Sequence, residues 1–324
     1  MLTPCWPSAH RVPTIQRTPS RITRSCGRRT YCEKTITALY HCGACRALRR
    51  QLPISAKYSF NGSGADVRWQ QSCAGSSRDR SRSLSITILA VGIAAIGIMC
   101  KAPQPGSTKT RLARAIGAVA ASELSACFLR DVAAAIEAVP ETLGRCGYAV
   151  YAPAGTEQVL RDLLPTEFGL LLQAGDDFGE VLFGAARDLL SAGHDCILLV
   201  NGDSPTLPCR FLVQAIETLR NSGDRLVLGP ASDGGYYLIG LKRPHRRLFA
   251  QIEWGTETVF SRTRERAEEI GLATALLPEW YDVDDLETLG WLRDELAGNS
   301  TRFQGGSPAL ATRSFLTASP LAGP

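Results

Sequence analysis

Histidine is scarce in this sequence, and the motifs of several enzyme classes are missing. The 324 residues include four histidines, and no two of them stand at the spacing of a zinc-binding pair. No serine, histidine and aspartate form the pattern of a hydrolase triad. No segment repeats along the chain. A zinc enzyme of the His-pair type, a triad hydrolase and a repeat protein are therefore disfavoured.

A disulfide framework is also absent from the larger part of the chain. Five of the eleven cysteines follow residue 84, each alone among apolar residues: Cys100, Cys127, Cys146, Cys196 and Cys209. Buried free cysteines behave as small hydrophobic side chains. We therefore expect a protein of a reducing compartment, the cytoplasm.

Residues 1–84 differ from the rest in charge. They hold 15 Lys or Arg against 3 Asp or Glu, whereas residues 85–324 hold 21 against 28. They are rich in Cys, Arg and Ser and poor in large aliphatic residues, so they cannot bury enough apolar area to offset the entropy of ordering. We predict a disordered extension, with no specific nucleic-acid partner. A targeting sequence stays open, as does a zinc site of Cys26, Cys32, His41, Cys42 and Cys45.

Residues 83–100 carry no charge and read SLSITILAVGIAAIGIMC. A helix that crosses a membrane needs about 20 apolar residues, so a weak signal anchor stays open here. A loop with Pro and Gly and then a helical pattern follow, which is how an α/β domain begins. We therefore predict a buried first strand over residues 95–100 and no membrane partner.

Apolar runs then alternate with amphipathic stretches. Strands are predicted at 95–100, 147–152, 169–173, 196–201, 225–229, 235–241 and 273–277. Helices are predicted at 109–138, 156–164, 178–192, 208–221, 256–270 and 285–297. This alternation indicates the α/β class, in three layers around a mostly parallel central sheet. Residues 301–324, rich in Ser, Thr, Gly and Pro, are predicted to be a flexible tail.

The loop after the first strand has the composition of a phosphate-binding loop. Residues 101–111 read KAPQPGSTKTR, where Gly106 permits close approach of a ligand. A helix that begins just after Gly106 would point free N–H groups at the loop, and Lys101, Lys109 and Arg111 add positive charge. The loop is not an ATPase P-loop, because the earlier glycine of that motif is missing and serine follows Gly106. We predict that it binds a diphosphate, with a capped, solvated helix start as the alternative.

Two acidic turns follow apolar strands. Asp203 comes just after the strand at 196–201, and ligands of open α/β sheets bind beyond the carboxyl ends of strands. We predict that Asp203 binds Mg²⁺ or Mn²⁺, with a simple turn aspartate as the alternative. Asp282 or Asp284 would supply a second ligand, unless this segment only caps the last helix.

The segment GPASDGGYYLIG at 229–240 is the predicted acceptor side. Asp233 is placed to orient an acceptor hydroxyl or to act as a general base, and a tight hairpin is the alternative. The two glycines after it permit close ligand approach. Tyr236 or Tyr237 and the tryptophan of EWGTETV offer aromatic faces. The residues expected to contact the acceptor are Gly234, Gly235, Tyr236 and Trp254.

Together these motifs resemble those of a known family. KAPQPGSTKTRL, GDDFGE, NGDSPTLP, GPASDGGYYLIGL, EWGTETV and YDVDD, in this order, are similar to segments of bacterial GT-A-like glycosyltransferases, some of an arsenosugar-biosynthesis type. The family is similar to nucleotidyltransferases such as 2-phospho-lactate guanylyltransferase and molybdenum cofactor guanylyltransferase. The resemblance covers about residues 96–297.

The resemblance implies a GT-A domain over residues 85–300 and a transferase activity. A nucleotide or nucleotide-sugar donor would bind Lys101, Gly106, Lys109 and Arg111. Mg²⁺ or Mn²⁺ would bind Asp203 with Asp282 or Asp284, and the catalytic residues would be Asp203, Asp233 and Lys109. Asn201 stands where an Asp-x-Asp motif has its first acid, as in several nucleotidyltransferases. We expect a metal-dependent glycosyltransferase acting on a small-molecule acceptor; nucleotidyl transfer and a non-catalytic nucleotide-binding protein are the alternatives.

Overall fold

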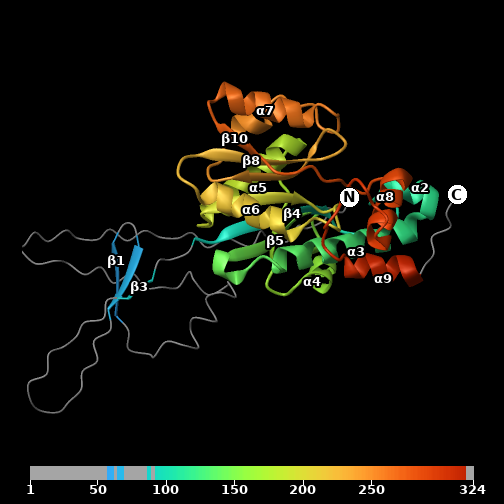
Figure 1. Ribbon diagram of the computed structural model, residues 1–324, viewed down its shortest axis with the longest axis horizontal. Coiled ribbons are helices and arrows are strands. Elements are labelled where there is room, and N and C mark those ends of the chain that lie inside the picture. Colours follow the sequence, from blue (N-terminus) through green and yellow to red (C-terminus); the bar gives the residue numbers. More distant parts are fainter. Residues whose placement is uncertain (1–56, 62–63, 69–85, 89–91, 319–324) are drawn as a thin grey trace, which may run out of the picture. The chain divides into compact units, whose positions relative to one another are not determined.

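The computed structural model describes residues 57–61, 64–68, 86–88 and 92–318, and its main feature is a seven-stranded sheet (Figure 1). The strand order is β10-β8-β9-β7-β4-β5-β6. β9 runs antiparallel to β7 and β8, and the other four pairs are parallel, as the predicted mostly parallel sheet requires. The strands are β4 (Ala94–Lys101), β5 (Arg145–Ala152), β6 (Gly169–Leu172), β7 (Cys196–Asn201), β8 (Arg225–Pro230), β9 (Tyr236–Leu241) and β10 (Ala273–Leu276). All seven strands match a predicted one within two residues.

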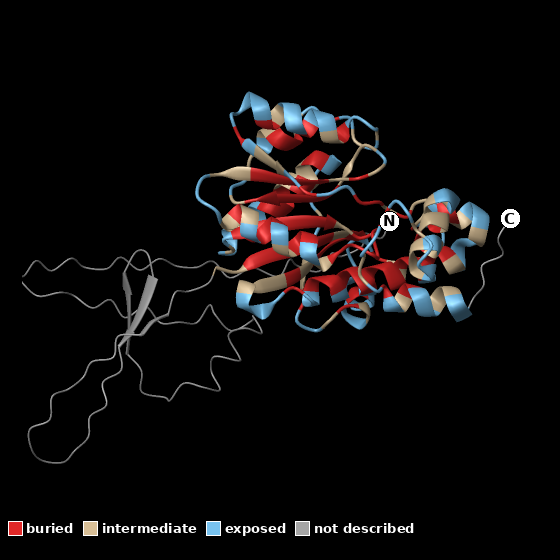
Figure 2. Ribbon diagram, in the orientation of Figure 1, coloured by how far each residue is buried: buried red, intermediate tan, exposed pale blue. Residues whose placement is uncertain are grey.

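Helices cover both faces of this sheet, because its central strands are apolar on both sides. In β4, Ile96 and Ile98 pack into one core, and Ala95 packs into a second core. The first core is closed by α3 (Ala118–Glu137), α4 (Glu157–Leu163), α6 (Cys209–Arg220) and α8 (Leu286–Ala297). The second is closed by α5 (Phe178–Ser191), η2 (Arg246–Phe249) and α7 (Val259–Glu269). Figure 2 shows buried strands between helices whose outer faces are exposed, which is the predicted three-layer arrangement.

From residue 92 onward, two differences from the predicted elements stand out. The helix predicted over 109–138 is divided at Gly117, whose φ of 88° interrupts the helical backbone, into α2 (Thr110–Ile116) and α3. Part of the predicted flexible tail forms α9 (Leu310–Ala318). The carboxylate of Asp131 in α3 accepts hydrogen bonds from the N–H groups of Ala311 and Thr312, at 2.9 and 2.8 Å. The composition of residues 301–324 could not predict α9, because its first turn is stabilised by Asp131, which is about 180 residues away in the sequence.

A separate three-stranded antiparallel sheet comes from the amino-terminal part of the chain. It contains β1 (Lys57–Asn61), β2 (Gly64–Arg68) and β3 (Ile86–Ile88). β1 and β2 fall within the predicted disordered extension, where the sequence indicated no element. The five residues of the alternative zinc site lie outside the described residues. Of the helices described, none is long and apolar enough to cross a membrane, and the cytoplasmic location stays a prediction.

Candidate active site

Loops at one edge of the large sheet carry the predicted site residues. The parallel strands β4 and β7 end there, at Lys101 and Asn201. β8 ends at the same edge, and the antiparallel β9 begins there, where Pro230 pairs with Tyr236. Carboxyl ends of neighbouring parallel strands leave a ligand-accessible edge in sheets of this kind. The topology therefore gathers loops that are more than 170 residues apart in the sequence.

Lys109 joins two of these loops. Its Nζ lies 2.8 Å from Oδ1 of Asp203 and 2.8 Å from Oδ1 of Asp284, and it donates a 2.7 Å hydrogen bond to the carbonyl of Val283. The backbone N–H of Val283 donates to the carbonyl of Asp203 at 2.9 Å, so the two acidic turns are also joined directly. The Lys109 side chain is 5% exposed, whereas those of Asp203 and Asp284 are 37% and 45% exposed. One cation is therefore buried beneath two carboxylates that a ligand can still reach.

Lys109 offsets part of the negative charge of Asp203 and Asp284. Burial alone would lower the pKa of Lys109, but the nearby carboxylates of Asp203 and Asp284 outweigh burial and raise it. Lys109 thus stays protonated and offsets the repulsion between the two acids. A third acid, Asp282, accepts a 2.5 Å hydrogen bond from the buried hydroxyl of Ser204. Burial raises the pKa of Asp282 to about 7, opposed by the Ser204 hydrogen bond and reinforced by the neighbouring acids.

The three predicted metal ligands are therefore not equivalent. Asp203 and Asp284 share Lys109, whereas Asp282 is hydrogen bonded to Ser204. In the part of the chain that the structure describes, no three His, Cys, Asp or Glu side chains are grouped to hold a metal ion. Capping of α8 was the alternative role for this acidic segment. The residue that caps α8 is Asp285, whose side chain accepts a hydrogen bond from the N–H of Thr288 at 3.0 Å.

The predicted phosphate loop leaves β4 and turns into α2. The carbonyl of Gln104 accepts hydrogen bonds from the N–H groups of Ser107 and Thr108, which closes the turn. Gly106, with a φ of 82°, faces open space. Lys109 turns inward with a φ of 51°, and Lys101 and Arg111 remain exposed. The loop therefore offers two exposed cations on either side of the buried Lys109.

The Asp233 turn connects β8 to β9 at the same edge of the sheet. Oδ1 of Asp233 accepts from the N–H of Gly235 at 2.9 Å, so part of its bonding is that of a local turn. Gly234 has a φ of 87°, and a Cβ there would lie 2.2 Å from the carbonyl oxygen of Glu257. The N–H of Phe260 donates to the carbonyl of Gly234 at 2.9 Å. The turn is thus packed closely on the start of α7, which explains the glycine at this position.

An aromatic row joins this turn to two other loops. The rings of Tyr236 and Trp254 meet edge to face at 6.5 Å, and Trp254 meets Phe178 in the same way at 5.2 Å. Phe178 is 45% exposed. Tyr236 and Trp254 are predicted acceptor residues that the fold brings together, whereas Tyr237, the alternative, is buried. The sequence did not single out Phe178, because Phe178 is the first residue of the helix predicted at 178–192. In the structure Asp177 caps that helix, α5.

Ser204 was also missed, although it follows Asp203 directly. It is fully buried, and no periodic pattern distinguishes a serine that orients a carboxylate from one in a turn. The partner, Asp282, is 78 residues away, so only the fold could reveal the pair.

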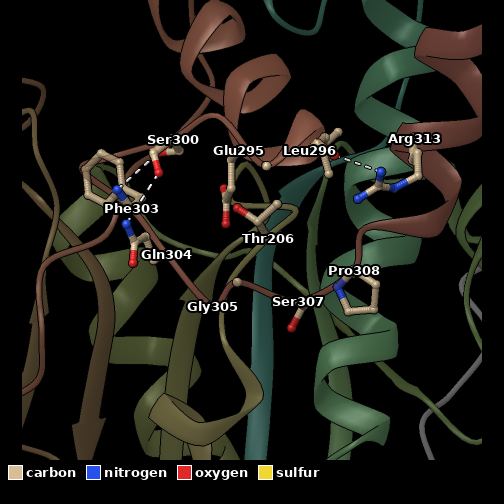
Figure 3. A pocket seen from close by; sticks show the side chains of 12 residues that line it. Thr206, Glu295, Leu296, Ser300, Phe303, Gln304, Gly305, Ser307, Pro308 and Arg313 are labelled. Atoms are coloured by element: carbon tan, nitrogen blue, oxygen red, sulfur yellow. Dashed lines mark hydrogen bonds between the residues drawn. The ribbon is translucent and has the colours of Figure 1, made fainter.

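A pocket of about 430 Å³ lies apart from the predicted residues, between the end of α8 and α9 (Figure 3). Glu295 and Thr206 face one another in it, and Glu295 accepts a 2.5 Å hydrogen bond from the Tyr281 hydroxyl. The N–H of Ser307 donates to the carbonyl of Thr206 at 2.8 Å, and the hydroxyl of Ser307 donates to the carbonyl of Leu207 at 2.6 Å. The segment after α8 is therefore hydrogen bonded to the loop that follows Asp203, at Thr206 and Leu207.

Comparison with known proteins bears on the fold of the large domain. Residues 135–256 match the family DUF2064, described as an uncharacterized protein conserved in bacteria. No curated protein matches the chain. A solved structure described as a "putative nucleotide-diphospho-sugar transferase" from Desulfovibrio desulfuricans G20 is 27% identical, with a TM-score of 0.59, over 69% of this chain and 95% of that one.

Two further solved structures are more distant. CMP:2-keto-3-deoxy-manno-octonic acid synthetase, complexed with CTP, is 13% identical with a TM-score of 0.43, over 64% of this chain and 99% of that one. Glucosyl-3-phosphoglycerate synthase from Mycobacterium tuberculosis, in complex with Mn²⁺ and UDP, is 10% identical with a TM-score of 0.39, over 64% and 78%. The comparisons confirm the predicted resemblance to bacterial GT-A-like glycosyltransferases, the α/β fold class and the transferase class.

Proposed function

We propose that this chain is a metal-dependent glycosyltransferase that uses a nucleoside-diphosphate sugar and acts on a non-phosphorylated small molecule. The observation that carries the proposal is the meeting of Lys109, Asp203 and Asp284 at the strand ends. The exposed cations Lys101 and Arg111 flank this group and would bind the diphosphate of the donor. The catalytic unit would be the predicted domain at residues 85–300.

The residues present fit a divalent cation. Mg²⁺ usually binds one or two protein carboxylates together with substrate phosphates and water. Asp203 and Asp284 are two carboxylates whose oxygens approach a single cation, Lys109 Nζ, and each remains more than a third exposed. These two residues would hold the metal, and Asp282, through Ser204, would support the turn beside it. When bound, Mg²⁺ or Mn²⁺ would neutralise charge on the diphosphate leaving group.

The charge of the other half of the site favours an acceptor without phosphate. The segments 173–178, 231–236 and 251–258, which the aromatic row connects, contain no Lys, Arg or His. Their five acids are all exposed: Asp176, Asp177, Asp233, Glu253 and Glu257. Like charges brought together cost free energy, so this surface would repel a phosphorylated acceptor. Trp254 and Phe178 would pack on an apolar face of the acceptor.

In this proposal Asp233 prepares the acceptor. Its carboxylate accepts the proton of the attacking hydroxyl, whose oxygen bonds to the anomeric carbon of the donor sugar. The bond from that carbon to the diphosphate oxygen breaks, and the nucleoside diphosphate leaves with the electron pair. Lys101 and Arg111 stabilise the charge that develops on the leaving oxygens.

A product assay tests this proposal. The full chain, freed of metal and then supplied with Mg²⁺ or Mn²⁺, is incubated with a panel of nucleoside-diphosphate sugars. Each free sugar acceptor is paired with its phosphorylated counterpart. We expect release of nucleoside diphosphate that needs the metal and favours the free member of each pair.

Two outcomes would replace the proposal by an alternative. Pyrophosphate released from a nucleoside triphosphate, with transfer to the phosphorylated acceptors, would make the chain a nucleotidyltransferase. If Asp203→Asn leaves the measured activity unchanged, this site does not catalyse that activity, and a site that only binds nucleotide is favoured.

A further inference from the structure

Lys109 occupies the position between Asp203 and Asp284 at which the proposed metal would bind. Its ammonium contacts one oxygen of each carboxylate at 2.8 Å, and its side chain is almost fully buried. A third bond, to the carbonyl of Val283 at 2.7 Å, holds the ammonium in place. An ammonium and a divalent cation cannot share these two oxygens at such distances without strong repulsion.

We infer that Lys109 competes with the divalent cation for Asp203 and Asp284, so that metal enters only when Lys109 leaves this position. The inference rests on the proposed function for the identity of the competing ligand. Lys109 is well placed to leave, because it is the residue before α2 and follows a turn with exposed glycine and serine. The displaced ammonium would find new partners in the phosphate oxygens of the donor.

The consequence is an order of binding. Without a nucleotide, a divalent cation must displace Lys109 and leave its ammonium without a carboxylate partner, which costs free energy because a buried charge needs pairing. With a nucleotide diphosphate present, the ammonium gains phosphate oxygens in place of the carboxylates. Lys109 therefore couples metal binding to donor binding, and the chain alone should bind divalent cations weakly.

Mn²⁺ binding in the absence of nucleotide tests the inference. The free ion is measured by electron paramagnetic resonance for the wild-type chain, Lys109→Met and Lys101→Met. Lys101 is the matched control, because it is an exposed lysine of the same loop whose charge acts on Asp203, whereas Lys109 contacts both carboxylates directly. We expect Lys109→Met to bind Mn²⁺ about tenfold more tightly than wild type, the usual size of such coupling, and Lys101→Met to change affinity much less.

Equal affinity of Lys109→Met and wild type would overturn the inference, as would an equal gain in both lysine variants. If Lys109→Met folds only when Mn²⁺ is added, which circular dichroism would detect, that result also supports competition. A second measurement uses the wild-type chain: the rate at which an acylating reagent modifies Lys109, read by mass spectrometry. The rate should rise when Mn²⁺ saturates the protein, with Lys101 as the internal reference, and continued protection of Lys109 at saturating bound Mn²⁺ would refute displacement.

These results are separable from a failure of the proposed function. If Asp203→Asn does not weaken Mn²⁺ binding in the Lys109→Met background, the metal site itself is wrong. If it does weaken binding but Lys109→Met gains nothing over wild type, only the competition is wrong.

Discussion

The close packing of Gly234 on the start of α7 gives a stability prediction whose size follows from the structure. In Gly234→Ala the new Cβ would lie 2.2 Å from the backbone oxygen of Glu257, in a residue with a φ of 87°. Placing alanine at a positive φ costs about 1–2 kcal/mol. Forcing an atom into packed backbone costs about 1–3 kcal/mol more. We expect a total loss of about 2–5 kcal/mol.

Gly155 supplies the matched control. Its φ is 86°, but a Cβ there meets nothing within 4 Å. Gly155→Ala should therefore lose only the conformational part, about 1–2 kcal/mol. For a domain of this size, thermal denaturation should show a drop of about 2–4 °C per kcal/mol, so that Gly234→Ala melts clearly below Gly155→Ala. Equal melting temperatures would refute the close contact between the Asp233 turn and α7, and with it the placement of the acceptor side.

Two further predictions concern Asp131 and Asp282. Asp131→Ala removes the carboxylate that caps α9. We expect the free energy of unfolding to fall by about 1–2 kcal/mol and hydrogen exchange in residues 310–318 to become faster. Unchanged exchange there would show that α9 does not depend on this cap. The pKa of Asp282 is about 7 in the folded protein, above its value of 3.8 in the unfolded chain, so ionisation of Asp282 opposes folding. The free energy of unfolding should therefore fall as the pH rises from about 4 to about 7. Asp282→Asn should lack this loss, and urea unfolding of both proteins across that interval should show the wild type falling relative to the variant. Parallel pH profiles would contradict the raised pKa.

Most of the fold was predictable from the sequence, because the strands are buried on both faces and read as continuous apolar runs. The run at 196–201 is an example: Leu198 packs into one core and Ile197 into the other. The break at Gly117 was not predictable, since an isolated glycine in a helical pattern is often tolerated. The order of the strands also required the structure, because periodicity says nothing about which strands pair.

The candidate site was predictable in its parts and less so in its connections. Asp203 was expected at a strand end, and Lys109 in a cationic loop, since both follow from local patterns. The burial of Lys109 against Asp203 and Asp284 could not be predicted, because these residues are far apart in the sequence. The same holds for the hydrogen bond between Asp282 and Ser204. Local patterns cannot rank Asp282 against Asp284, because alternation points both to the same side of an extended segment.

The central claim is that Asp203 and Asp284, from different turns, form one site for a metal and a nucleotide diphosphate. Melting temperature with nucleoside diphosphates and Mn²⁺ tests it most directly, because a ligand at 100 times its Kd stabilises a protein by about 2.7 kcal/mol. The account predicts a rise of about 5–10 °C for wild type and for Asp162→Asn, an exposed acid on α4. Asp203→Asn and Asp284→Asn should each lose most of this rise. A full rise in both variants would contradict the account.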